Sequence, residues 1–91
     1  MEIAKLVSAL EETISYLKIS QSSDWSTLPV DEIVRRLERE VVKARSLKPM
    51  DVNLLDCLFA PTGALQEISI DNGWGTEFLR ISEVSDQFTS R

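Results

Sequence analysis

Two apolar stripes with the spacing of an α-helix constrain the fold most. The first stripe has large apolar residues at intervals of three and four, namely Ile3, Leu6, Val7, Leu10, Ile14 and Leu17. The second follows Pro29 and comprises Ile33, Val34, Leu37, Val41, Ala44 and, as a further candidate at its end, Leu47. Each stripe needs an apolar surface to pack against. The sequence therefore predicts two long amphipathic helices, at about 2–18 and 29–48, that pack on each other.

Proline and charge mark the ends of the second helix. Pro29 suits the first helical position, because it lacks the N–H that a first turn leaves unbonded. Glu32 lies in the first turn, and Arg45 and Lys48 lie near the other end, as the helix dipole favours. Pro49 blocks continuation.

A shorter helix is expected next, over residues 52–60. Asp51 is a suitable N-cap, and the helix should stop before Pro61. Cys57 lies in this apolar segment with no base nearby in sequence, so we expect its thiol to be buried and unreactive.

The last third predicts two further helices. Residues Leu65–Ile70 could form a strand, but a lone hairpin would have no sheet to join, so a helix of about Ala64–Asn72 is favoured. Gly73 should end it in a left-handed conformation, and Thr76 should cap a final helix over 77–88. The whole chain of 91 residues is thus expected to be one all-α domain of four to five helices, two long and two or three short.

Residue types that the chain lacks exclude several chemistries. It has no histidine and only one cysteine, which removes Ser-His-Asp and Cys-His catalysis, histidine metal sites and the ordinary zinc sites. No apolar run is long enough to span a bilayer, and the start "MEIAKLVSALEET" lacks the basic and apolar regions of a secretory signal. We therefore expect a cytoplasmic protein that is not an enzyme and has no catalytic residues, metal or cofactor.

The net charge of −5 is concentrated in one segment. Residues 49–79 contain five acids and no base, and the other residues contain ten of each. We call residues 49–79 the acidic segment. An acidic surface of this kind suits a basic protein partner, although solubility alone would also explain it. Trp74 is read either as core, which its flanking glycines favour, or as part of an interface. The candidate partner-binding residues are Asp51, Asp56, Glu67, Asp71, Trp74 and Glu77.

The second helix carries an alternative site. A basic ridge of Arg35, Arg36, Arg39 and Lys43 could follow a phosphate backbone. Three acids, Glu32, Glu38 and Glu40, interleave with it, which favours a solvated, ion-paired face over a nucleic-acid surface.

The stretch "LLDCLFAPTGALQEISIDNGW" resembles a loose group of small bacterial helical proteins, which carry a short helix, a glycine-containing turn and a polar–apolar segment after it. Some of these proteins are suspected of neutralising toxins as immunity proteins. The resemblance implies an all-helical fold and a protein partner, and it carries over no catalytic residue.

The expected function is therefore protein binding, with an inhibitor or immunity protein as its most concrete form. Its acidic segment would cover a basic surface of the target. The alternatives are a nucleic-acid-associated module that uses the basic ridge, and an assembly adaptor or chaperone. A homodimer formed through the apolar edge of the first helix is compatible with each of them.

Overall fold

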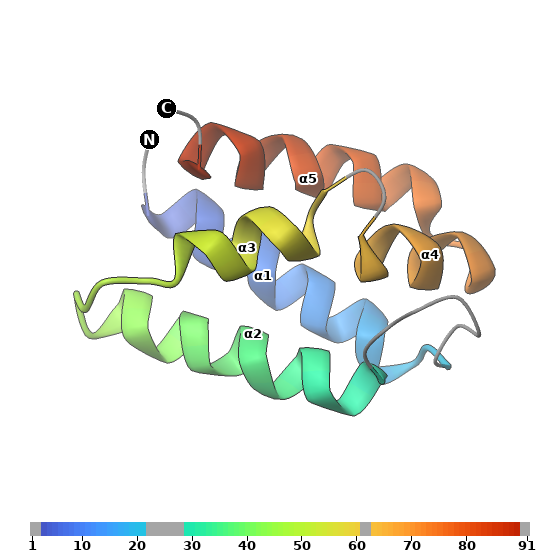
Figure 1. The fold of residues 1–91 in the computed structure, drawn as a ribbon, viewed down its shortest axis with the longest axis horizontal. Coiled ribbons are helices and arrows are strands. Elements are labelled where there is room, and N and C mark those ends of the chain that lie inside the picture. Colours follow the sequence, from blue (N-terminus) through green and yellow to red (C-terminus); the bar gives the residue numbers. More distant parts are fainter. Residues whose placement is uncertain (1–2, 22–28, 61–62, 90–91) are drawn as a thin grey trace.

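The computed structural model describes residues 3–21, 29–60 and 63–89, and the regular secondary structure in these ranges is entirely helical. The helices are α1 (Ile3–Lys18), α2 (Val30–Arg45), α3 (Val52–Leu58), α4 (Ala64–Asp71) and α5 (Gly75–Thr89), as Figure 1 shows. The predicted all-α fold is thereby confirmed, and the segment that could have been a strand belongs to α4. The radius of gyration of 12.0 Å equals the value of about 12 Å expected for a compact chain of this length.

Helix α1 lies at the centre of the arrangement and packs on both α2 and α5. Helices α3 and α4 pack against α5, and Figure 1 shows them one after the other along it, α4 beside its first half and α3 beside its second. One end of the molecule therefore combines α4 with the start of α5. The other end combines the connection between α2 and α3 with the start of α1 and the end of α5.

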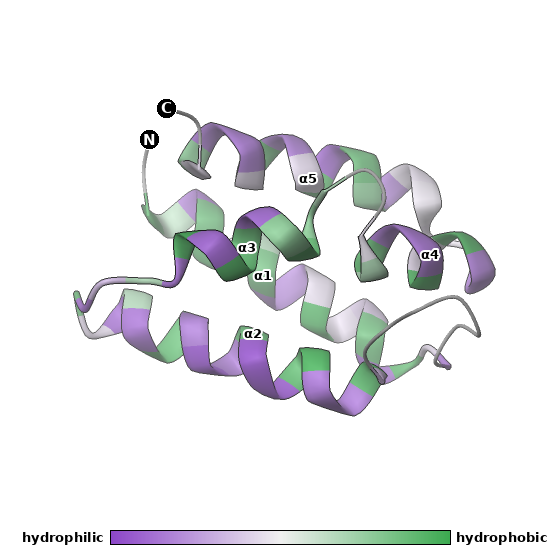
Figure 2. Cartoon of the chain, viewed as in Figure 1, coloured by the Kyte–Doolittle hydropathy of each residue, from purple (hydrophilic) through white to green (hydrophobic). Residues whose placement is uncertain are grey.

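The core is built from the apolar stripes that the sequence predicts. α2 shows the two-sided pattern clearly in Figure 2, where hydrophobic and hydrophilic residues alternate along the helix. Within the described residues, no helix has both the length and the apolar character that a bilayer span requires. The fully buried apolar side chains are Leu6, Leu10, Leu17, Ile33, Leu37, Leu55, Leu65, Ile68 and Ile81, with Phe59 and Phe78 almost as deep.

Ile3, the first residue of the first stripe, is 38% exposed, and two further expected burials are wrong as well. Leu47 is 90% exposed, because α2 ends at Arg45 and the chain turns away before the stripe is complete. Cys57 is also exposed. Helix α3 is short and directs only Leu55 and Leu58 into the core, so Cys57, between them on the helix, faces outward.

Most of the predicted helix ends are confirmed. The side chain of Asp51 caps α3, with its Oδ1 atom accepting the N–H of Leu54 at 3.0 Å. Pro29 stands one residue outside α2, at the N-cap position. The prediction that Thr76 caps α5 is wrong, because α5 begins at Gly75, and the carbonyl of Trp74 accepts the N–H of Phe78 at 2.9 Å. Pro61 lies outside the described residues.

Candidate functional site

The turn between α4 and α5 is a helix stop rather than a binding loop. Gly73 has a φ angle of 83°, in the left-handed region that glycine tolerates. The N–H of Trp74 donates to the carbonyl of Ser69 at 2.8 Å, and that of Gly73 donates to the carbonyl of Ile70 at 3.4 Å. These two bonds are those of a Schellman motif, which satisfies the last carbonyls of a helix.

The same turn is attached to the end of α1. Trp74 is 3% exposed, its ring stacks on Tyr16 with centroids 5.0 Å apart, and its Nε1–H donates to Ser20 Oγ at 2.9 Å. Beside it, the Asn72 side chain accepts the N–H of Gln21 at 3.0 Å and donates to its carbonyl at 2.9 Å. Trp74 is therefore core. Its ring is not part of the exposed surface, which corrects its inclusion among the partner-binding residues.

The five carboxylates of the acidic segment do not converge on one point. Asp51 and Asp56 belong to α3 and its cap, Glu67 and Asp71 to α4, and Glu77 to α5. Asp51, Asp56 and Asp71 are exposed, and Glu67 and Glu77 are half-buried. No group of three or more cysteine or acidic side chains that could hold a metal ion occurs within the described ranges. The segment is a broad negative surface rather than a chelating cluster.

A cation, Arg80, lies near Glu77. Arg80 forms an ion pair with Glu12 that joins α5 to α1. The Glu12 carboxylate raises the pKa of Arg80, chiefly by accepting its hydrogen bond, and Glu77 adds a smaller Coulombic contribution. Part of the charge of Glu77 is therefore already compensated within the molecule.

The acidic segment contains an apolar groove between α4 and α5, which we call the α4–α5 groove. It has a volume of about 270 Å³ and is lined by Gln66, Ser69 and Ile70 of α4 and by Gly75, Thr76, Phe78 and Leu79 of α5. Ile70 and Leu79 remain 59% and 62% exposed. The Oε1 atom of Gln66 is buried and accepts no hydrogen bond from the described residues. Sequence reasoning missed both apolar residues, although each breaks the polar pattern expected of an outward-facing position.

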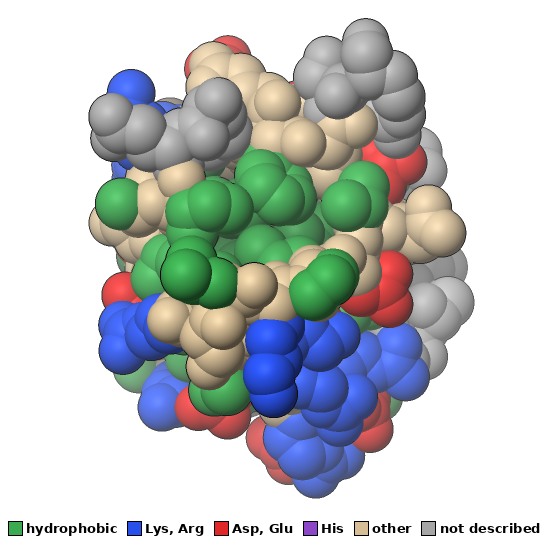
Figure 3. All heavy atoms as spheres, turned by 90° about the vertical axis from the view of Figure 1, so that its left-hand side faces the viewer, with side chains coloured by type: hydrophobic (Ala, Val, Ile, Leu, Met, Phe, Trp, Pro, Cys, Tyr) green, Lys and Arg blue, Asp and Glu red, His purple; other side chains and the backbone are tan. Residues whose placement is uncertain are grey.

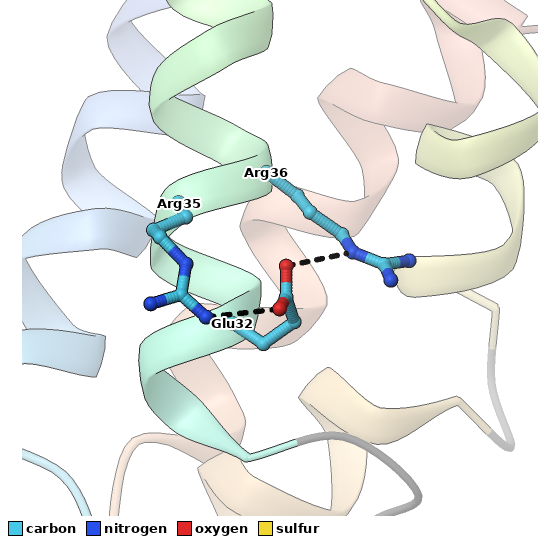
Figure 4. Close-up of polar contacts among 3 residues, drawn as sticks. All are labelled: Glu32, Arg35 and Arg36. Atoms are coloured by element: carbon cyan, nitrogen blue, oxygen red, sulfur yellow. Dashed lines mark hydrogen bonds and ion pairs between the residues drawn. The ribbon is translucent and has the colours of Figure 1, made fainter.

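Glu32 neutralises two members of the basic ridge on α2. Figure 4 shows its carboxylate accepting from Arg35 Nη2 at 2.9 Å and from Arg36 Nε at 3.2 Å. The hydrogen bond from Arg35, followed by that from Arg36, lowers the pKa of Glu32. The same carboxylate raises the pKa of Arg35. These guanidinium groups are held against their own helix.

Glu40 is the acid that sequence reasoning misplaced. It was expected on a solvated face, but it is 1% exposed. Its Oε2 atom accepts from Lys43 Nζ at 3.0 Å, and its Oε1 atom accepts the N–H of Asp51 at 2.6 Å. The carboxylate therefore ties the chain that follows α2 back onto the helix. Within the described ranges, only Arg39 of the four ridge residues has no ion pair.

A second apolar depression lies at the opposite end of the molecule, and we call it the terminal hollow. It has a volume of about 270 Å³ and is lined by Ile3, Ala44, Leu47, Lys48, Pro49, Met50 and Phe88. Figure 3 shows this face, with hydrophobic side chains gathered around a depression and Lys and Arg side chains gathered below it. None of its members was identified from the sequence as a candidate site residue, because they come from three separate parts of the chain.

Comparison with known proteins adds no assignment to this geometry. No protein-family model, no curated protein and no solved structure matches the chain. The resemblance to small bacterial helical proteins therefore stays a prediction.

Proposed function

We propose that the chain is a non-enzymatic protein-binding domain that docks a basic partner on the α4–α5 groove. The observation that carries the proposal is the exposure of Ile70 and Leu79, at 59% and 62%, inside a segment that contains no lysine or arginine. Protein interfaces combine an apolar centre with a polar rim, and this groove with its flanking carboxylates has both parts.

The polar groups at the groove define the chemistry of the partner. The buried Oε1 atom of Gln66 has no donor within the described residues, and a buried acceptor gains from a donor brought by a partner. Glu67 lies one helical turn before Ile70, on the neighbouring part of the surface. A partner with lysine or arginine beside apolar side chains supplies both the donors and the opposite charge. Complementary potentials also speed the encounter.

An inhibitor that covers a basic surface is one form of this function, and it is the form that the resemblance to immunity proteins implies. A nucleic-acid interface on α2 is not proposed as a second function. Arg35 and Arg36 form ion pairs with Glu32, and Lys43 forms one with Glu40. Phosphate groups would therefore have to displace ion pairs that are already formed.

The proposal is tested by affinity capture from cell extract, quantified by mass spectrometry, with the chain and its variants as bait. The double variant Ile70→Ser, Leu79→Ser should lose the captured partners, and those partners should carry basic surfaces. Val42→Ser is the matched control, because Val42 is also 62% exposed but lies on α2. Glu67→Lys should weaken capture more at low salt than at high salt. Equal recovery of the same proteins by the double variant and by the control would contradict the proposal.

A further inference from the structure

The backbone at the end of α2 has the same hydrogen-bond pattern as the end of α4. The N–H of Lys48 donates to the carbonyl of Lys43 at 2.8 Å, and the N–H of Leu47 donates to the carbonyl of Ala44 at 3.2 Å. Leu47 occupies the position that Gly73 occupies in α4, and its φ angle is 57°. This left-handed conformation suits glycine and is strained for leucine, whose Cβ crowds the following carbonyl.

Leu47 recovers no stability from burial either, since its side chain is 90% exposed. A leucine that is strained in its backbone and hydrated in its side chain is unfavourable on both counts for an isolated chain. Burial of that side chain against another molecule removes the second disadvantage. The exposed leucine at this strained position therefore points to a contact that is made outside this chain.

The neighbours of Leu47 form a surface that fits such a contact. Ile3 and Val52 are 38% and 40% exposed at the same end of the molecule, and Met50 and Phe88 are half-buried in the terminal hollow. The hollow's volume of about 270 Å³ lies just below the range of roughly 300–1,000 Å³ that small-molecule pockets occupy. It is better matched to one or two apolar side chains of a partner.

The charge at the terminal hollow is opposite to that at the α4–α5 groove. Lys48 is the charged residue in its lining, and it makes no ion pair within the described residues. Lys43 and Arg45 lie in the last turn of α2, paired with Glu40 and Glu11. The acid next to the lining is Asp51, whose Oδ1 atom already accepts the N–H of Leu54. Among the described residues, the lining itself carries one positive charge, that of Lys48, and no acid.

We propose that the terminal hollow is a second docking surface, which takes a segment of another protein in which large apolar side chains stand beside carboxylates. The apolar side chains cover Leu47 and fill the hollow, and a carboxylate pairs with Lys48. This surface is independent of the α4–α5 groove. With both surfaces occupied, the chain links a basic partner at one end to an acidic partner at the other.

The test uses two pools of synthetic 12-residue peptides. One pool alternates Leu, Phe and Met with Asp and Glu, and the other alternates the same apolar residues with Lys and Arg. Fluorescence anisotropy with the full chain should detect binding of the acidic pool. Amide NMR shifts on titration should be confined to Leu47–Met50, the start of α1 and the end of α5.

Leu47→Gly is the decisive variant, because it separates binding from folding. It should raise the thermal unfolding midpoint by a few degrees, since glycine relieves the strained turn. It should also weaken binding of the acidic pool at least tenfold. Lys48→Glu should weaken binding of the same pool more at low salt than at high salt. Ile19→Ser is the matched control and should leave the affinity unchanged, because Ile19 is 83% exposed and follows the end of α1, beside the α4–α5 turn.

Four results would overturn the proposal. One is no binding of the acidic pool, and another is equal binding of the basic pool. The third is self-association in sedimentation that Leu47→Gly abolishes, which would assign the hollow to a second copy of the chain. The fourth is binding to vesicles of phosphatidylglycerol and phosphatidylcholine that requires Leu47 while the peptides stay unbound, which would assign it to a lipid surface.

Discussion

The ends of α2 and α4 use one backbone motif with opposite side-chain choices. At the end of α4, Gly73 takes the left-handed position and Trp74 follows it into the core at 3% exposure. At the end of α2, Leu47 takes that position at 90% exposure, and the exposed Lys48 follows it. The first end serves stability, and the second leaves an apolar side chain in water. Residues that oppose local stability are the ones to examine for a role in binding.

The largest effect is expected from removing the anchor of the α4 end. Trp74→Ala removes the stacking on Tyr16 and the bond to Ser20, and it should lower the free energy of unfolding by about 3–5 kcal/mol. Urea unfolding followed by far-UV circular dichroism measures the loss. Trp74→Phe keeps an aromatic ring but no donor, so its loss should be near 1 kcal/mol. A loss below about 1 kcal/mol for the alanine variant would show that Trp74 does not stabilise the end of α4.

The second largest effect is expected at the end of α2, where the Glu40 carboxylate binds the chain that follows the helix. Glu40→Ala leaves the N–H of Asp51 without its acceptor and Lys43 without its partner, and about 2–3 kcal/mol of stability should be lost. Glu38→Ala is the matched control on the same helix, because its ion pair with Lys18 spans 3.8 Å between exposed side chains and should contribute less than about 0.5 kcal/mol. Equal losses of stability in the two variants would show that the buried bonds of Glu40 do not stabilise the fold.

Exchanging the residue types between the two motifs tests the comparison directly. Leu47→Gly should raise the free energy of unfolding by about 0.5–1 kcal/mol, because relief of the left-handed strain outweighs the added freedom of the unfolded chain. Gly73→Ala should lower it by about 1 kcal/mol through backbone strain alone, since no atom lies within 4 Å of the added Cβ. Leu47→Ala keeps the strain, so it should change stability little. Changes of the same sign for the two exchanges would contradict the comparison.

Acidification should produce the smallest effect, and at α2 rather than α4. Arg35 and Arg36 lower the pKa of Glu32 below its ordinary value of 4.5, so their pairing stabilises the folded state above that pH. The contribution is lost as the pH falls through the lowered folded-state pKa. The difference in stability between the native chain and Glu32→Gln should therefore shrink on acidification. Asp71→Asn is the control, because Asp71 makes no ion pair within the described residues, and it should not reproduce the trend.

Local sequence was sufficient to predict the helices and most of their ends. The stripes of α1 and α2, the Asp51 cap and the left-handed Gly73 depend on neighbours within a few residues. For the same reason, periodicity alone placed Leu47 on the stripe. It cannot show that the helix would end two residues earlier, at Arg45, in a motif that usually carries glycine.

The surfaces could not be predicted in the same way, because they depend on residues that are distant in sequence. Glu40 is buried because the chain after α2 returns over it with the N–H of Asp51. The terminal hollow needs Ile3 and Phe88, which lie near the two ends of the chain, beside Leu47. The acidic segment was visible as a count of charges, but the groove within it appears only when α4 packs on α5.

The attachment of the α4–α5 turn to the end of α1 also has a kinetic consequence. The bonds of Asn72 to Gln21 and of Trp74 to Ser20 join residues 51 and 54 positions apart. Such contacts form only after a long loop has closed. During synthesis, more than half of the chain must therefore follow the end of α1 before Asn72 and Trp74 can bond to it. We expect α1 and α2 to associate first. Trp74 should then pack on Tyr16 and bond to Ser20 late, as the step that completes folding.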